Sequence, residues 1–305
     1  MAKSRVKVAA IQLKTSDNLD FNLKSALSLT ERAAKSGAKI ICLPELYRTI
    51  YFPQYSKIKK ENFAETIPGE STRAFSKLAI KYRVTIIVPL FEKQKNDYYN
   101  SAAVISENGK LLTTYRKNHI PHDPGFYEKG YFQESRNGYK IYKTKFATFA
   151  VLICYDQWFP EAARVARLQG AEVIFYPTAI GNILSYKAEG DWHNAWETIQ
   201  RGHAIANSLY VVGVNRVGIE GRMQFFGQSF ISDPFGQVLK RAGKKQQILV
   251  ADLDLEKNKF YSEGWGFLRN RRPDTYKLLT SNRLVDKSKK LKKVTHYKAM
   301  KEALR

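Results

Sequence analysis

Short apolar runs alternate along the chain with longer segments in which apolar residues recur every three or four positions. The short runs are rich in β-branched residues and predict buried strands at 6–13, 39–43, 84–91, 146–153, 171–176, 209–215 and 247–253. The periodic segments predict helices over 22–36, 71–82, 161–168 and 194–207. Gly37 and Gly170 are placed to end two of these helices, Ser71 to cap one, and Pro160 to open one. This alternation predicts a layered α/β fold.

Two turn signals show that the predicted sheets are not purely parallel. Glu107-Asn108-Gly109 separates the runs 101–106 and 111–116, and a second turn at 233–236 separates 228–232 from 237–240. Each predicts a hairpin, so the sheets should be mixed. Residues 1–280 contain no linker-like or low-complexity stretch, and we interpret them as one domain.

The segment 281–305 has a different pattern and forms a basic C-terminal tail. An apolar stripe at helical spacing is formed by Leu291, Val294, Tyr297, Met300 and Leu304. Such a helix could dock on a neighbouring subunit, or lie on an anionic membrane or nucleic acid. The density of lysines and the terminal position favour instead a mobile tail, whose deletion would leave activity unchanged.

Composition excludes several classes of protein. Of the 305 residues, 44% are hydrophobic and 13% aromatic, which is enough for a large core and excludes global disorder. We expect neither a membrane span nor a secretory signal, because the chain has no apolar stretch of the required length. Two cysteines, Cys42 and Cys154, argue against a disulfide framework and predict a cytoplasmic location.

The chain is strongly basic, with 51 Lys and Arg against 28 Asp and Glu and a net charge of +23. The excess is spread along the sequence and has a local peak in the tail. A field of this sign attracts nucleic acid and anionic membranes and repels cationic substrates. For the body of the chain we interpret it as a solvated basic surface.

Three potentially reactive side chains each follow a predicted strand: Glu45, Lys117 and Cys154. A cysteine near a helix start should have a lowered pKa and nearby N–H donors for an oxyanion. A carboxylate and an ammonium beside such a thiol could act as base and as electrostatic stabiliser. Taken singly, each has an ordinary alternative: a buried inert cysteine, a helix-start carboxylate and a surface lysine.

Other candidates for chemistry are weaker. His119 and His122 have ligand-like spacing but no accompanying Cys or Asp cluster, so a structural role is favoured over a metal site. Cys42 lies within a strand and is expected in the core. No phosphate-binding glycine motif is present. Tryptophans could wall a pocket for an ammonium group, although core packing is the more ordinary role for at least two of them.

The segments PELY, YRKNHIP and CYDQWFPEAARVARLQGAEVIFYPTAIG together resemble the nitrilase superfamily of carbon–nitrogen hydrolases, over nearly all of 5–280. The resemblance implies a four-layer α-β-β-α sandwich with mixed sheets, dimerisation through helices, and neither metal nor cofactor. It implies a catalytic triad of Glu45, Lys117 and Cys154, with Glu128 as a second glutamate that orients the lysine. We expect substrate contacts from Tyr127, Tyr155, Asp156, Trp158 and Thr178.

The same resemblance implies a cysteine-dependent amidase acting on a small ureido amine, and a homo-oligomer built from dimers. Another amidase of the superfamily, acting on a β-ureido acid or an ω-amide, is the alternative within this class. A nucleic-acid or membrane-surface binder acting through the basic tail is the alternative of another class; we expect no obligate nucleic acid and no membrane. Departures from the family pattern at Tyr155, Asn194 and the loop after Gly181 bear on the substrate pocket rather than the reaction.

Overall fold

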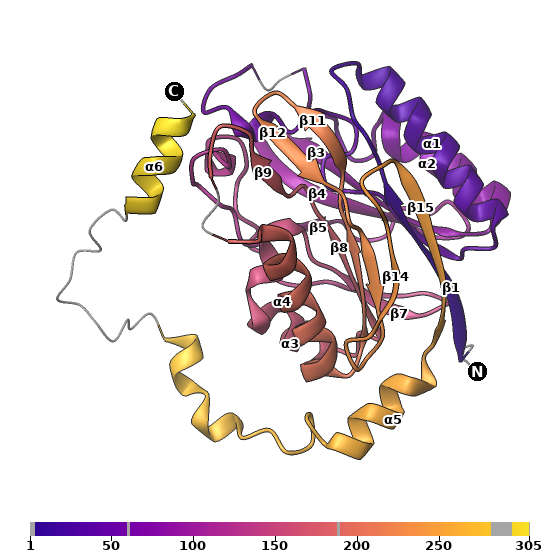
Figure 1. Cartoon of the computed structure of the whole chain (residues 1–305). Helices are drawn as coiled ribbons and strands as arrows, with labels where there is room; N and C mark the ends of the chain where they lie inside the picture. Colours follow the sequence, from indigo (N-terminus) through magenta and orange to yellow (C-terminus); the bar gives the residue numbers. More distant parts are fainter. Residues whose placement is uncertain (1–3, 60–61, 188–189, 282–294, 305) are drawn as a thin grey trace.

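Two mixed six-stranded sheets packed face to face form the centre of this computed structural model, which describes residues 4–59, 62–187, 190–281 and 295–304 (Figure 1). The first sheet has the order β15 (Gln247–Asp254), β1 (Arg5–Gln12), β2 (Ile40–Cys42), β3 (Thr85–Gln94), β4 (Asp97–Ile105) and β5 (Tyr115–Arg116). The second has the order β14 (Val238–Arg241), β13 (Phe230–Ser232), β10 (Tyr210–Val214), β8 (Val173–Pro177), β7 (Thr148–Val151) and β6 (Ile141–Lys143).

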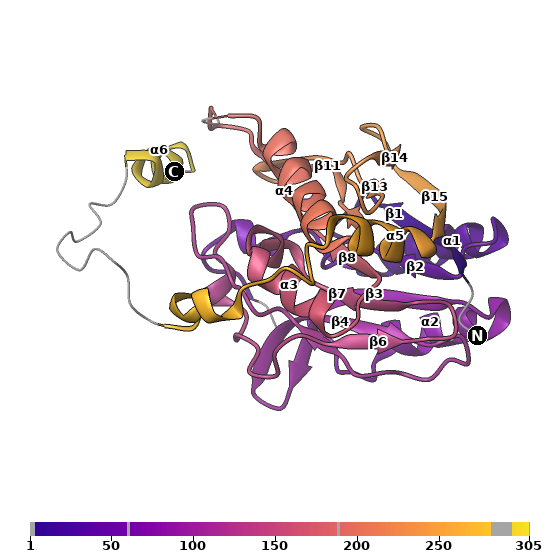
Figure 2. The same cartoon turned by 90° about the horizontal axis from the view of Figure 1, so that it is seen from below.

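A pair of helices covers the outer face of each sheet. α1 (Leu19–Lys35) and α2 (Glu70–Tyr82) lie on the first sheet, and α3 (Pro160–Leu168) and α4 (Trp192–Asn207) on the second, as Figures 1 and 2 show from two sides. Strand β1 shows why the layers form. Val8 and Ala10 point into the cluster between the sheets, whereas Ala9 and Ile11 pack under α1 and α2. The predicted four-layer α-β-β-α sandwich with mixed sheets is confirmed.

Parallel pairing at the centre of each sheet places the ends of several strands together. β1, β2 and β3 are parallel neighbours, as are β7, β8 and β10, while the outer strands pair antiparallel. In open α/β sheets the carboxyl ends of such strands gather the functional loops. Here β2 leads to Glu45, β7 to Cys154 and β5 to Lys117.

A small third sheet and several short helices were not predicted. The small sheet consists of β11 (Val217–Glu220), β12 (Met223–Phe226) and β9 (Gly181–Ile183). The helix α5 (Glu256–Trp265) follows β15, and the 3₁₀ helices are η1 (Phe52–Gln54), η2 (Glu128–Gly130), η3 (Cys154–Trp158), η4 (Pro273–Thr275) and η5 (Lys277–Thr280). The strands of the small sheet have three or four residues, and none of them lies in a continuous apolar run like the one that marks β2.

Two predicted helix starts are displaced in the structure. Helix α2 begins one residue before Ser71, and Gly69 is its N-cap. The prediction of Ser71 as the cap is wrong because its hydroxyl donates to Glu65 and contacts the hydroxyl of Tyr47 instead. Helix α1 begins earlier than predicted because the Asn18 side chain accepts from a backbone N–H of its first turn.

The C-terminal segment includes a helix, α6 (Thr295–Ala303), that lies against the body of the molecule (Figure 1). Met300 and Leu304 of the predicted apolar stripe are buried, at 4% and 7% exposure. The expectation of a mobile tail is therefore wrong for 298–304, whose apolar side chains have a binding site on the same chain. Leu291 and Val294 lie outside the described residues.

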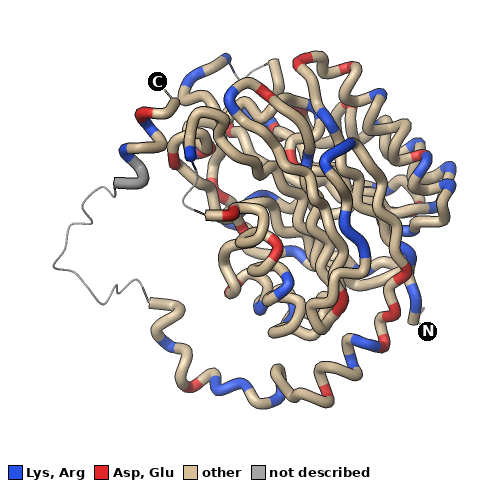
Figure 3. The backbone as a smooth tube through the Cα atoms, in the orientation of Figure 1, with Lys and Arg blue, Asp and Glu red and all other residues tan. Residues whose placement is uncertain are grey.

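Lys and Arg positions are spread along the backbone, with the less numerous Asp and Glu positions interspersed among them (Figure 3). Most of the ion pairs are between partly exposed groups, such as Lys7 with Asp252. Such pairs contribute little to stability individually. Within the described residues, no helix is both long and apolar enough to cross a membrane.

Candidate active site

The structure brings together the three reactive side chains that the sequence places far apart. Glu45, Lys117 and Glu128 are completely buried, and Cys154 is 7% exposed. The Lys117 ammonium lies 2.8 Å from Glu45 Oε1 and 2.6 Å from Glu128 Oε2. The thiol of Cys154 is close enough to all three for their charges to act on its pKa. The result is one buried cluster of a thiol, an ammonium and two carboxylates.

Lys117 is held as a cation by its two carboxylate neighbours. Burial alone would lower the pKa of Lys117, but attraction by Glu128 and Glu45 raises it above the usual value for lysine. Glu128 receives a further hydrogen bond from the Tyr51 hydroxyl, at 2.8 Å from Oε1. A fixed buried cation of this kind can stabilise negative charge that develops on a neighbouring oxygen.

The two carboxylate oxygens of Glu45 differ in their hydrogen bonding within the described residues. Its Oε1 accepts from Lys117 and from Asn100 Nδ2, the latter at 2.7 Å. Its Oε2 is buried and has no hydrogen-bond partner among the described residues. A buried carboxylate oxygen without a donor is costly. This oxygen is therefore available to take a proton from a group that reacts in the site.

Cys154 begins η3, separated from the end of β7 by two residues, and has a positive φ of 44°. This left-handed backbone is strained for a residue with a side chain, and such strain concentrates at functional sites. Burial raises the pKa of Cys154 well above the usual value for a thiol, Glu45 raises it further, and Lys117 only partly opposes this. The predicted lowering of this pKa is therefore wrong, because burial beside carboxylates outweighs the helix start.

Two side chains of the sequence Cys-Tyr-Asp-Gln hold the nucleophile turn in place. Asp156 accepts from the backbone N–H of Ile153 and of His119, and from the Tyr115 hydroxyl. It therefore links the turn to the segment that carries Lys117. Gln157 links the turn to α4 and to Thr178. Its Oε1 accepts hydrogen bonds from the side chains of Trp196, Gln200 and Thr178.

A buried arginine, not singled out in the sequence, fixes the turn that carries Glu45. Arg216 Nη2 donates to the backbone oxygens of Glu45 and Leu46, each at 2.8 Å. Its Nη1 forms an ion pair of 2.7 Å with Glu220, which is itself buried. Leu46 has a positive φ of 48°, so these bonds stabilise a strained backbone. No local pattern in the sequence marks Arg216 for this role, because its partners lie some 170 positions earlier in the chain.

Comparison with known proteins agrees with this geometry. The sequence profile of the family described as carbon-nitrogen hydrolase matches residues 7–261.

The chain belongs to this family.

Proteins with curated functions resemble it over most of their length. An N-carbamoylputrescine amidase of Solanum lycopersicum is 43% identical over 285 residues, covering 90% of this chain and 94% of that protein. A citrullinase of Francisella tularensis is 40% identical over 282 residues, covering 90% of this chain and 97% of that protein. The crystal structure of a carbon-nitrogen hydrolase from Helicobacter pylori G27 superposes with a TM-score of 0.87 at 38% identity, covering 92% of this chain and 100% of that one. This chain is therefore a carbon–nitrogen hydrolase of the nitrilase superfamily.

The hydrolase uses several of the predicted substrate-contact residues for its own hydrogen bonds. Asp156 and Thr178 are fully buried, and their side chains bond within the protein as described above. For these two, the structure favours positioning of the turn over contact with substrate. Trp158 packs, partly buried, against the central core. Tyr155 and Tyr127 are partly exposed and remain candidates for contact with substrate.

His119 and His122 of the hydrolase pack in different surroundings. His119 Nδ1 lies 2.7 Å from Asp156 Oδ1, and its ring stacks on Phe159 at 3.7 Å. His122 is exposed and packs edge-on against Tyr127. Within the described residues, no group of three His, Cys, Asp or Glu side chains is arranged to hold a metal ion.

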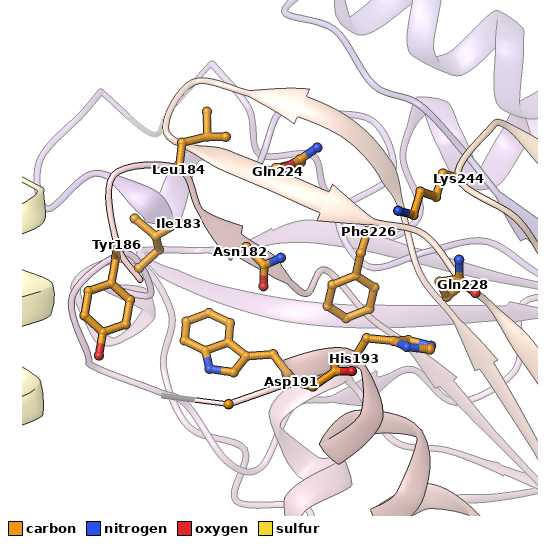
Figure 4. A pocket seen from close by; sticks show the side chains of 12 residues that line it. Asn182, Ile183, Leu184, Tyr186, Asp191, His193, Gln224, Phe226, Gln228 and Lys244 are labelled. Carbon is orange, nitrogen blue, oxygen red and sulfur yellow. The ribbon is translucent and has the colours of Figure 1, made fainter. Parts of the chain in front are cut away.

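A separate pocket of about 490 Å³ lies on the outer face of the small sheet (Figure 4). Asn182, Gln224 and Phe226 face it, and Asp191 and His193 at the start of α4 border it. Met223 and Phe225 point to the opposite face of the sheet, into a buried cluster that includes Tyr51. The small sheet therefore separates this pocket from the side of the molecule that holds Cys154.

Proposed function

We propose that this enzyme hydrolyses the ureido group of N-carbamoylputrescine to putrescine, carbon dioxide and ammonia. The observation that carries the chemistry is the buried cluster of a thiol, an ammonium and a carboxylate with one unpartnered oxygen. The substrate is inferred from the similarity to an N-carbamoylputrescine amidase over nine-tenths of the chain.

In the first half of the reaction, Cys154 attacks the ureido carbon. The raised pKa of Cys154 keeps the resting thiol neutral, so its proton must leave during attack. Glu45 Oε2 takes that proton, and the negative charge that develops on the ureido oxygen lies beside the Lys117 ammonium. The tetrahedral intermediate collapses when protonated Glu45 gives its proton to the departing nitrogen, and an S-carbamoyl (thiocarbamate) adduct remains on Cys154.

In the second half, water replaces the departed amine or ammonia. Glu45, again a carboxylate, takes a proton from water as the water oxygen attacks the thiocarbamate carbon. Collapse returns the proton to sulfur and releases a carbamic acid, which loses carbon dioxide. Measuring the mass of the adduct on Cys154 shows whether ammonia or the diamine leaves first.

Glu128 acts in this proposal as a positioning residue for Lys117. It contacts the ammonium at 2.6 Å and is fixed by the Tyr51 hydroxyl on its other oxygen. With Glu45 it sets the Lys117 ammonium at one point in the site. A lysine on a flexible side chain needs such fixation to act as a preorganised charge.

The distal end of the substrate is where the candidate substrates differ. N-carbamoylputrescine ends in an ammonium, which the net charge of +23 opposes at long range. Charges farther away than about 8 Å are largely screened at physiological salt, so local groups decide. Asp123 lies close enough to Tyr155 to raise its pKa, in addition to the effect of burial. An acid and an aromatic ring near the nucleophile suit an ammonium.

A panel of ureido substrates tests the proposal, with ammonia release as the measurement. N-carbamoylputrescine, citrulline and 3-ureidopropionate all carry a ureido group, and the last two add a carboxylate. We expect the highest kcat/KM for N-carbamoylputrescine. Faster hydrolysis of citrulline would point to the activity named for the Francisella relative, and faster hydrolysis of 3-ureidopropionate to a ureido-acid amidase.

Activity and stability should respond to acid in opposite directions. Burial raises the pKa of Glu128 from its usual 4.5 to about 7, although Lys117 opposes this. As the pH falls through about 7, Glu128 takes up a proton and loses its negative charge beside Lys117, so kcat/KM should decrease. The folded state binds this proton before the unfolded state does, so this group's contribution to stability increases from about pH 7 down to about 4.5.

The matching variant for this pH dependence is Glu128→Gln, which cannot titrate. Its melting temperature should lack the increase between neutral and mildly acidic pH that the wild type shows. Melting temperatures and kcat/KM are measured on both proteins over the same pH series. Identical pH dependence of stability in the two proteins would show that Glu128 is not the group responsible.

We also propose that residues 1–280 form the hydrolase domain and that the enzyme is a cytoplasmic homo-oligomer built from dimers, without obligate nucleic acid. An apolar surface on α5 and the following turns supports the oligomer. Phe260, Trp265, Leu278 and Leu279 are each more than half exposed. Large exposed apolar patches mark interaction sites. Light scattering on the purified protein tests this assembly.

A further inference from the structure

Among the described residues, Met300 and Leu304 and hydrogen bonds to two backbone carbonyls attach the C-terminal helix α6 to the body. Met300 and Leu304, four residues apart on one face, are buried in a cluster that includes Leu46, Tyr51 and Ile183. The carbonyl of Leu304 accepts from Arg222 Nη1 at 2.7 Å, and that of Ala303 accepts from the Ser185 hydroxyl. Between Lys298 and Glu302, every residue of the helix except Met300 is exposed.

The cluster that receives α6 is also part of the surroundings of the reactive side chains. Tyr51 bonds Glu128, Leu46 directly follows Glu45, and the backbone oxygen of Ala179, another member, lies 4.0 Å from Cys154 Sγ. A single layer of side chains therefore has the reactive groups on one side and α6 on the other.

One contact places Leu304 directly on a loop of the site. A methyl group built on Gly125 would lie 3.6 Å from Leu304 Cδ1 and 3.0 Å from Ile183 Cδ1. Gly125 is three residues before Glu128 and two after Asp123, the acid near Tyr155. Gly125 has a positive φ of 80°, so this turn is built for close approach. Leu304 thus holds the turn that carries Asp123 against β9.

The same helix lies at the edge of the separate pocket. Ile183 and Tyr186 line that pocket, and both also pack into the cluster that holds Met300 and Leu304. In Figure 4, α6 is visible beyond Tyr186 at the left edge of the view. Helix α6 therefore packs against both the turn that contains Gly125 and the loop that follows β9.

We infer that α6 supports the outer wall of the substrate site and that Met300 and Leu304 are positioning residues whose packing sets the preference for the length of the substrate's distal chain. The inference rests on the proposed function for the identity of the substrate. Its physical basis is that the two side chains pack into the cluster whose other members bond or adjoin Glu45, Glu128 and Cys154. One methylene in an enclosed apolar site changes kcat/KM by roughly 10- to 200-fold, so a fixed wall discriminates chain length.

The double variant Met300→Ala/Leu304→Ala tests this wall, with Phe21→Ala/Ile80→Ala as the matched control. The control side chains are also large and apolar but are exposed, at 59% and 57%, on α1 and α2. Ureido amines with three, four or five methylenes are compared by kcat/KM. In the test variant we expect the preference between four and five methylenes to fall by about tenfold or more, and in the control to stay unchanged.

A second readout does not depend on the substrate. Alkylation of Cys154 by a bulky maleimide and by small iodoacetamide is followed by peptide mass, which distinguishes it from the fully buried Cys42. Loss of the wall should accelerate the bulky reagent selectively. Arg222→Ala, an exposed change on the body side of the contact, should act in the same direction if the double variant folds poorly.

The outcomes separate the two proposals. Wild type that hydrolyses N-carbamoylputrescine, together with unchanged chain-length preference and maleimide rate in both α6-contact variants, overturns the wall and leaves the proposed function intact. Equal losses for all chain lengths also overturn it, because they indicate a structural role only. Wild type inactive on every ureido amine overturns the proposed function, and the maleimide rates still decide whether α6 is a wall.

Discussion

Replacing Cys154 with serine is expected to lower turnover by at least roughly a thousandfold while the protein remains folded. The side chain lies at a strained backbone position with its sulfur 4.0 Å from Ala179 O, and a serine hydroxyl fits the same space. A hydroxyl has a much higher pKa than a thiol, so Glu45 cannot remove its proton as readily during attack. Steady-state ammonia release and circular dichroism measure the two effects.

Cys42 provides the matched control for this substitution. It is completely buried in the central strand β2 of the first sheet. Cys42→Ala should lower stability by about 1 kcal/mol or somewhat more through lost packing, with kcat nearly unchanged. Intact mass of the wild type with substrate should show an adduct that the Cys154→Ser protein lacks. Turnover of that serine variant within about tenfold of wild type would contradict the assignment of the nucleophile.

The positions of Glu45 and Cys154 were predictable because each follows a strong strand signal. The runs before these two residues are apolar and β-branched, whereas the run 111–116 before Lys117 is more polar and forms a strand only at Tyr115–Arg116. The apolar pattern could not predict the pKa of each reactive side chain. The pKa of Cys154 depends on burial beside Glu45, a contact between residues more than a hundred positions apart.

Supporting residues were less predictable because their roles depend on tertiary contacts alone. Arg216 reaches across the fold to the backbone of Glu45, and Asp156 joins two loops separated by some forty positions. Neither has a local pattern that distinguishes it from an ordinary surface charge. The family resemblance included the segment that contains Asp156, and the structure supplies the physical reason for both side chains.

The prediction of a mobile C-terminal tail was wrong for a different reason. Its lysine density favoured a mobile segment, but helical spacing placed Met300 and Leu304 on one face, and both are buried. Burial of a large aliphatic side chain is worth about 1.5–3 kcal/mol, which exceeds the weak repulsion between exposed lysines. In this segment, the spacing of the apolar residues therefore predicts the structure better than the density of the lysines between them.

Glu45→Gln is expected to reduce kcat by roughly 10²- to 10⁴-fold with little change in fold, since the side chain keeps its shape. The amide oxygen can still accept from Lys117, but the amide nitrogen then occupies the position of Oε2 and cannot take the thiol proton. Lys117→Ala should be comparably impaired because it removes the oxyanion charge and leaves two buried carboxylates facing each other. Glu197→Gln, a buried carboxylate on α4 paired with Arg241, is the control and should retain its rate.

Combining these substitutions distinguishes a cooperating triad from three independent contributors. If Glu45 acts only by taking the proton of Cys154, then Glu45→Gln adds little to a protein that already carries Cys154→Ser. The logarithms of the losses should therefore be far from additive, and the same holds for Lys117→Ala combined with Cys154→Ser. Single and double variants are compared by kcat/KM on one substrate. Losses that add fully, from single variants with substantial remaining activity, would mean that the three side chains do not act on one step, and the proposed mechanism would have to be abandoned.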